Sequence, residues 1–169
     1  MLFDKDKKYM KIALKVAKEA ELNNEFPVGA VLTIDDMVIG TASNKLNLNR
    51  DWNSHAERIL MDKYGKKIKT MPRNKKLQIY TTLEPCLMCM GTIVLNKFDR
   101  LVYGCKDPSG GATGLDLNSL PEWYKYQWPE VKSGVLAKEA YNILVKYMIK
   151  NYDKENYLLN SFLEMGKPK

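Results

Sequence analysis

The sequence has few of the residues that form disulfide frameworks or imidazole sites. It contains three cysteines and one histidine among 169 residues, and two of the cysteines, Cys86 and Cys89, share one Cys-x-x-Cys. This count excludes the disulfide framework of small secreted domains and leaves the thiols free for other chemistry. Any reaction that needs an imidazole has to use His55.

Long apolar runs are also absent. No uninterrupted run approaches the roughly 20 residues that span a bilayer, and Met1 to Lys5 lack the apolar stretch of a secretory signal. We therefore expect a cytoplasmic protein without membrane association. The sequence has no internal repeat, and its length with 45% hydrophobic residues predicts one domain over residues 1–169.

Acidic residues are fewer than basic ones. The chain has 27 Lys and Arg against 20 Asp and Glu, a formal charge of +7 and a pI of about 9.2. This excess favours contact with phosphate backbones through counterion release. A basic surface that only keeps a protein soluble has the same composition, so charge alone leaves nucleic-acid binding open.

Hydrophobic periodicity predicts helices and strands that alternate after an opening helix and hairpin. Helices are expected over residues 5–22, 55–65, 85–96 and 136–150, and strands over residues 28–34, 37–40, 77–82, 101–105 and near 131. Residues 43–54, 66–76 and 106–114 are expected to be loops, the second basic and the third glycine-rich, followed by an irregular segment rich in Trp and Tyr. Residues 151–169 are expected to form a partly helical tail. This order predicts an α/β fold, a three-layer α/β/α sandwich with a mixed central sheet.

Two segments carry the residue types of a metal centre, His55-Ala56-Glu57 and Pro85-Cys86-Leu87-Met88-Cys89. Cys86 and Cys89 are three apart, so they share one helix face, and Pro85 sets them in the first turn, where the helix dipole favours thiolates. With His55 they supply three ligands to one zinc ion per chain, whose fourth position stays open to water. Glu57 is predicted to lie beside the ligands as the catalytic acid and base. Thiolate and imidazole favour zinc, although iron and cobalt also accept such ligands.

Three other interpretations of these residues stay open. Ser54 and Glu57 fit a capping box, in which Glu57 only bonds back to the Ser54 amide. Cys105 could be a fourth ligand that closes the site to water, or a small buried residue. Cys86 and Cys89 could be a redox pair, which would make the histidine motif a coincidence.

The His-x-Glu and Pro-Cys-x-x-Cys motifs resemble the signature of the zinc deaminases of the cytidine deaminase superfamily. Further segments are similar to the tRNA-specific adenosine deaminases of the bacterial wobble-editing type: Asn24 to Val31, Asn44, Thr82 to Cys89, Tyr103 to Gly114 and Gly134 to Leu136. The resemblance extends from about Asn24 to Lys150, and the tail lies outside it.

The resemblance implies conversion of adenosine to inosine at the anticodon wobble position of tRNA, by a homodimer that takes the flipped nucleotide into its zinc pocket. It implies that Asn44 hydrogen-bonds the nucleoside, that Val28 and Ala30 line the base pocket, and that Asp107 contacts the ribose of a neighbouring nucleotide. Each residue has a structural alternative: Asn44 could only stabilise its loop, Asp107 could only turn the glycine-rich segment, and Val28 is a common strand residue.

The sequence departs from that family at two segments where substrate identity could be decided. Trp52-Asn53-Ser54 replaces the usual Pro-Thr-Ala before the histidine, and residues 123–128 replace a more basic stretch. Trp52 could stack on a base or anchor its loop by packing. Two rival functions therefore remain: a deaminase of a free nucleobase or nucleoside, of the guanine or cytosine type, and a non-catalytic zinc-stabilised RNA-binding subunit, for which Glu57 has no use.

Overall fold

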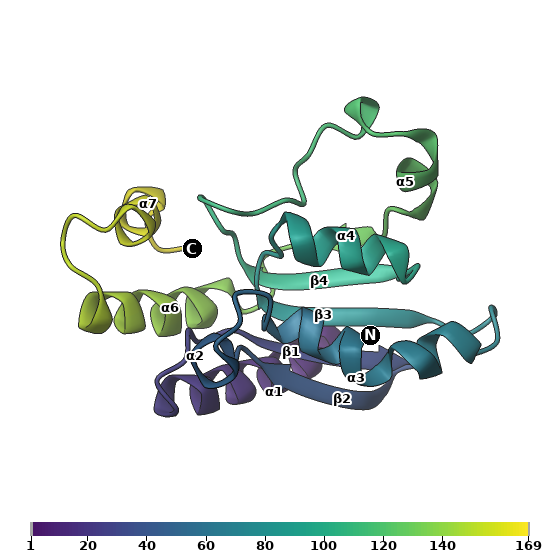
Figure 1. The fold of residues 1–169 in the computed structure, drawn as a ribbon, viewed down its shortest axis with the longest axis horizontal. Coiled ribbons are helices and arrows are strands. Elements are labelled where there is room, and N and C mark those ends of the chain that lie inside the picture. Colours follow the sequence, from purple (N-terminus) through teal and green to yellow (C-terminus); the bar gives the residue numbers. More distant parts are fainter. Residues whose placement is uncertain (1, 169) are drawn as a thin grey trace.

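A five-stranded mixed sheet forms the centre of the fold in the computed structural model, which describes residues 2–168 (Figure 1). The strands, in the order β2-β1-β3-β4-β5 across the sheet, are β1 (Gly29–Ile34), β2 (Met37–Ser43), β3 (Leu77–Leu83), β4 (Arg100–Cys105) and β5 (Glu130–Lys132). β1 runs antiparallel to β2 and β3, whereas β3, β4 and β5 are parallel. The helices are α1 (Leu2–Leu22), α2 (Leu46–Asn49), α3 (Ala56–Thr70), α4 (Leu87–Leu95), α5 (Glu122–Gln127), α6 (Ala137–Asn151) and α7 (Tyr157–Met165).

Helices cover both faces of this sheet, and two glycines show how closely the helices pack on it. A Cβ on Gly29 would lie 2.2 Å from the Ala13 carbonyl oxygen of α1, so only glycine fits there. Gly40 pairs with Leu32, which lies on the sheet face opposite to Gly29, and a Cβ on Gly40 would meet the Tyr64 ring of α3. α6 lies on the α1 side and α4 beside α3 (Figure 1). The predicted three-layer α/β/α sandwich is confirmed.

The predicted hairpin and the predicted strands β1 and β3 are confirmed as well. Asp35 and Asp36 join β1 to β2 with φ angles of 48° and 63°, the left-handed conformations that a two-residue hairpin turn of the I′ type requires and that Asp tolerates. Every residue of β1 and of β3 is buried, as expected for strands covered on both faces.

The helix that begins after His55 is longer than the sequence predicts. We expected it to end near Gly65, but α3 continues to Thr70, because one glycine costs a helix only about 1 kcal/mol and Ile68 still buries its side chain against the core. The C-cap that follows the helix is Met71, whose ψ of 152° is extended. Pro72 follows and disfavours a helical conformation for the residue before it.

Two further segments that were predicted to be irregular contain short helices. α2 lies in the predicted loop 43–54, and its first amides donate to the buried carboxylate of Glu25, from Asn47 N at 3.0 Å and Leu48 N at 2.7 Å. α5 lies in the Trp- and Tyr-rich segment. Because the partner of α2 is 22 residues away in the sequence, local patterns did not reveal this helix.

The tail is partly helical, as predicted. α7 packs on α6 through Phe162, which is fully buried, and Tyr141 of α6 donates a hydrogen bond to the Phe162 carbonyl. The prediction of one domain over residues 1–169 stays a prediction, and its end residues 1 and 169 lie outside the described part. Among the helices within residues 2–168, none is long and apolar enough to cross a membrane.

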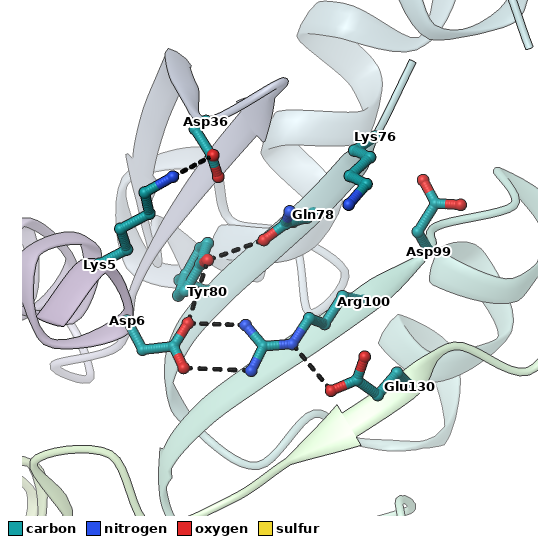
Figure 2. A pocket seen from close by; sticks show the side chains of 9 residues that line it. All are labelled: Lys5, Asp6, Asp36, Lys76, Gln78, Tyr80, Asp99, Arg100 and Glu130. Carbon is teal, nitrogen blue, oxygen red and sulfur yellow. Dashed lines mark hydrogen bonds and ion pairs between the residues drawn. The ribbon is translucent and has the colours of Figure 1, made fainter. Parts of the chain in front are cut away.

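A charged hollow of about 310 Å³ lies at the N-terminal ends of β3 and β4 (Figure 2). Its buried residue Asp6 accepts both guanidinium branches of Arg100, at 2.6 and 3.1 Å, and the ammonium of Lys132 at 2.6 Å. Burial raises the pKa of Asp6, but these cations outweigh burial and hold the pKa below its usual value. The network ties α1 to β4 and β5, at the end of the strands away from the cysteines.

Candidate metal centre and active site

The three predicted ligands meet where two helices begin beside the sheet. His55 is the N-cap of α3 and Cys86 is the N-cap of α4, with Cys89 as the third residue of that helix. Pro85 therefore precedes the cap, rather than standing in the first turn as predicted. Two helix N-termini thus converge here, and their positive dipole ends favour thiolate sulfur at this point.

The distances among these side chains match a tetrahedral zinc site. Nδ1 of His55 lies 3.7 Å from Sγ of Cys86 and 3.6 Å from Sγ of Cys89, and the ligand atoms of all three residues lie within 4.8 Å of one another. Zinc bonds of about 2.0 Å to nitrogen and 2.3 Å to sulfur put tetrahedral N and S ligands about 3.5 Å apart. Nδ1 is thus the nitrogen that faces the metal position.

The charges of the ligands are strongly coupled. A hydrogen bond from Cys89, assisted by His55, lowers the pKa of Cys86 to about 4 despite partial burial. The hydrogen bond to Cys86 and burial both raise the pKa of Cys89, and the bond to Cys86 raises the pKa of His55. Uptake of a divalent cation by both sulfurs therefore releases protons.

Glu57 lies beside the ligands and is not one of them. Its side chain is only 3% exposed; Oε1 accepts a 2.8 Å hydrogen bond from Thr81 Oγ1, and Oε2 lies 3.6 Å from Sγ of Cys89. Burial, partly offset by hydrogen bonds, raises the pKa of this carboxyl. A buried carboxyl with one oriented oxygen and one facing the metal ligands is well suited to move protons.

The three alternative interpretations of these residues are wrong. Ser54 precedes the N-cap and bonds to Asn49 and Asp51, while Glu57 turns toward Thr81, so the two form no capping box. Cys105 is buried, donates to the Lys106 carbonyl, and is absent from the ligand cluster found among residues 2–168. The imidazole against both sulfurs means that the histidine motif is no coincidence.

The residues expected near the base lie around the ligand helices. Asn44 is buried, and its Oδ1 accepts the Ala56 amide at 2.8 Å, so it caps α3 across twelve residues. Ala30 is fully buried and pairs with Thr81, which sets its side chain on the same sheet face as the Thr81 bond to Glu57. Val28 is also buried, and its carbonyl accepts the Asn44 amide at 3.1 Å.

Glu84, which the sequence analysis missed, organises the glycine-rich loop. Its buried carboxylate accepts the Asp107 amide at 3.1 Å and the amide and hydroxyl of Thr113 at 3.1 and 2.5 Å. A Cβ on Gly111 would lie 2.4 Å from this carboxylate, so the loop needs glycine there. Asp107 in turn accepts two amides of its own loop, from Ser109 and Gly110. The position of Glu84 between a buried strand and the first cysteine is the sequence signal that could have revealed this role.

Comparisons with known proteins agree with this site. The sequence profile of the cytidine and deoxycytidylate deaminase zinc-binding region matches residues 3–105. The chain therefore belongs to this family of zinc-dependent deaminases, and His55, Cys86 and Cys89 are positioned to bind its metal ion.

Two sequence relatives show to which group of zinc deaminases the chain belongs. The tRNA-specific adenosine deaminase of Bacillus subtilis is 40% identical over 139 residues, which cover 82% of this chain and 86% of the relative. That of Haemophilus influenzae is 37% identical over 152 residues, covering 89% and 87%. Within the zinc deaminases, this chain belongs to the family of tRNA-specific adenosine deaminases.

Two solved structures resemble the fold. One, from work on tRNA:A34 deaminases that edit A to I at the wobble position of transfer RNA, has a TM-score of 0.71 and 33% identity and covers 81% of this chain and 99% of its own. A guanine deaminase from Nitrosomonas europaea has a TM-score of 0.69 over 83% of each chain. At 20% identity, the second likeness concerns the fold alone.

Proposed function

We propose that this protein deaminates adenosine to inosine at the wobble position of tRNA. The 40% identity to the tRNA-specific enzyme of Bacillus subtilis, across most of both chains, carries this proposal. The three clustered ligands and the adjacent buried carboxyl support it. The reaction adds water at C6 of adenine and releases ammonia.

Glu57 moves the protons of this reaction. Zinc, when bound, supplies a Lewis acid that makes water nucleophilic near neutral pH. Oε2 of Glu57 accepts a proton from the attacking water, delivers it to N1 of the ring, and later transfers the second proton of the water to the departing amino group. Thr81 holds Oε1 at 2.8 Å, so that Oε2 faces the metal ligands, where the protons are transferred. Burial of the carboxyl keeps bulk water from competing for these protons.

The substrate contacts that the family resemblance implies are supported by the same geometry. The Asn44 amide group is oriented by its bond to Ala56, and within residues 2–168 its Nδ2 has no hydrogen-bond partner, which leaves a donor for the nucleoside. Val28 and Ala30 form the apolar wall behind the base. Asp107 uses Oδ1 for its own loop and keeps Oδ2 for the ribose of a neighbouring nucleotide.

The excess positive charge of the chain is concentrated in one segment, which is suited to bind a polyanion. Residues 63–76 hold seven of the 27 Lys and Arg and no acid, and the other 20 balance the 20 Asp and Glu. Lys63, Lys66 and Lys67 stand three and four apart on an exposed face of α3, where like charges destabilise an isolated helix. When the phosphates of an RNA bind this face, they neutralise the lysines and relieve the repulsion. We call residues 63–76 the basic segment.

We also propose a cytoplasmic homodimer. α4 exposes 67% of Leu87 and 61% of Leu95, two turns apart on one helix face, with Gly91 between them. Such a face is typical of a surface that a second copy covers. The three free thiols, two of them metal ligands, suit a reducing compartment. Light scattering during gel filtration tests the dimer, and Leu95→Lys is expected to give a monomer.

The function is tested by incubating the zinc-loaded protein with tRNA, free adenosine, cytidine and guanine, and measuring inosine and ammonia. Inosine at the wobble position of tRNA is expected, and Glu57→Gln should lose about 10²- to 10⁴-fold in kcat while keeping one zinc. Turnover of a free base or nucleoside alone would overturn the proposal. Binding of tRNA without turnover, unchanged by Glu57→Gln, would favour a non-catalytic subunit.

A further inference from the structure

Trp52 projects into solvent from a loop that is otherwise tied down. Its side chain is 86% exposed, so the packing-anchor interpretation is wrong. The loop lies between α2 and the metal ligand His55, three residues after Trp52. A large aromatic side chain gains nothing for folding in this position, since its apolar surface stays in water.

The backbone under Trp52 is held on both sides. Asp51 accepts the Asn53 amide at 2.9 Å through Oδ1 and the Ser54 hydroxyl at 3.2 Å through Oδ2. Ser54 is buried and its carbonyl accepts the Lys45 amide at 3.0 Å. Before the loop, Glu25 holds the first amides of α2. The Trp52 ring is thus presented from a rigid base, which limits the entropy lost when a ligand stacks on it.

A cation accompanies the exposed ring. Arg50 is exposed and adopts a left-handed conformation with φ of 51° that ends α2, and within residues 2–168 it forms no ion pair. A hollow of about 280 Å³ is lined by Leu46, Asn47, Arg50, Asp51 and Trp52. It combines an indole, an apolar side chain and an unpaired guanidinium with the Asp51 carboxylate, whose oxygens accept hydrogen bonds from Asn53 and Ser54.

We propose that Trp52 and Arg50 form a nucleotide subsite in which the indole stacks on the base beside the deaminated nucleotide and the guanidinium binds its phosphate. An indole stacks on any base, and a guanidinium matches phosphate oxygens. The subsite lies three residues before a metal ligand, so a strand whose target nucleotide occupies the metal centre passes close to it. A free base reaches only the metal centre. This inference rests on the proposed function, because it assigns the neighbouring nucleotide of the same RNA.

The first test compares Trp52→Ala and Trp52→Phe in deamination of an anticodon stem-loop RNA. Trp52→Ala is expected to raise KM about 5- to 150-fold with kcat little changed, since base–aromatic stacking is of this size. Trp52→Phe should restore most of the affinity. Leu22→Ala, which removes an equally exposed apolar side chain from the end of α1, should have no effect. An unchanged KM for Trp52→Ala would overturn the subsite.

The second test identifies the ligand. Two stem-loop RNAs are used, each of which lacks the base on one side of the wobble nucleotide. One of them should bind the wild type more weakly than the intact stem-loop does. The same RNA should bind Trp52→Ala no more weakly than the intact stem-loop does. The Trp52 contribution to fluorescence, obtained by difference against Trp52→Phe, should be quenched by the intact RNA only. Equal losses in both proteins would reject stacking and leave Trp52 to a protein partner. Wild-type deamination of RNA distinguishes these results from failure of the proposed function.

Discussion

Thr81 Oγ1 donates a 2.8 Å hydrogen bond to Oε1 of Glu57, although the two residues lie 24 positions apart. The bond connects the central strand β3 to the first turn of α3 and fixes the buried carboxyl beside the metal ligands. Both partners are buried, so water does not compete for the bond.

Thr81→Val should therefore lower kcat for tRNA about tenfold to a hundredfold while zinc content stays the same. The substitution keeps the side-chain shape and removes the donor that orients Glu57, and a hydrogen bond to a charged group contributes about 1.5 to 3 kcal/mol. Thr33→Val is the matched control, because Thr33 is a buried strand residue whose hydroxyl has no partner within residues 2–168. It should keep full activity and raise the free energy of unfolding by about 1 kcal/mol. Equal kcat for Thr81→Val and wild type would contradict the orienting role.

Cys105→Ser should keep one zinc per chain, whereas Cys86→Ser should lose tightly bound zinc. Cys105 donates to a backbone carbonyl and is not in the ligand cluster, while Cys86 faces His55 at 3.7 Å. Plasma emission spectrometry after gel filtration against a weak chelator measures the metal content. Zinc loss in Cys105→Ser with an unchanged circular dichroism spectrum would restore the closed four-ligand site.

Asn44 combines a structural and a proposed substrate contact, and two substitutions separate them. Asn44→Ala removes the acceptor of the Ala56 amide and should lower the free energy of unfolding by about 1 kcal/mol, the usual effect of losing a helix cap. Asn44→Asp keeps that acceptor but replaces the Nδ2 donor, so it should retain stability and lose most of kcat/KM. Urea unfolding and steady-state kinetics give the two quantities. Full activity of Asn44→Asp would reject the nucleoside contact.

The basic segment should control the salt dependence of tRNA processing. Changing Lys63, Lys66, Lys67 and Lys69 to Gln should flatten the slope of log kcat/KM against log salt by about 1 to 3, since each phosphate contact contributes about 0.7 to 0.9. The control variant changes Lys8, Lys11, Lys15 and Lys18 of α1 to Gln, with the same loss of charge on the opposite sheet face. If both variants flatten the slope equally, net charge rather than the basic segment attracts the RNA.

Asp6 should make the protein acid-sensitive. Its cations hold the pKa of Asp6 below the unfolded value of about 3.9, so the stability it contributes is present above that pH and is lost as pH falls through the folded pKa. Asp6→Asn should lower the free energy of unfolding at pH 7 by about 3 kcal/mol and flatten its decline below pH 4. Asp62→Asn, in an exposed pair with Arg58, should change it by less than about 1 kcal/mol. A similar acid dependence in Asp6→Asn and wild type would contradict this role.

The sequence by itself determined the metal ligands, the carboxyl beside them and the layered fold. These depend on local rules: one imidazole, two thiols three residues apart, and strands and helices whose periodicities differ. The same rules failed at the end of α3, where burial of Ile68 outweighed the helix-weakening Gly65.

Only the tertiary structure decided which distant residues support the site. Thr81 orients Glu57, Glu84 holds the glycine-rich loop, and Asn44 caps the helix that begins with the zinc ligand. It also turned Trp52 outward rather than into the core. These contacts join residues up to 29 positions apart, and no local pattern encodes them, because their energies depend on burial that exists only once the sheet and helices have packed.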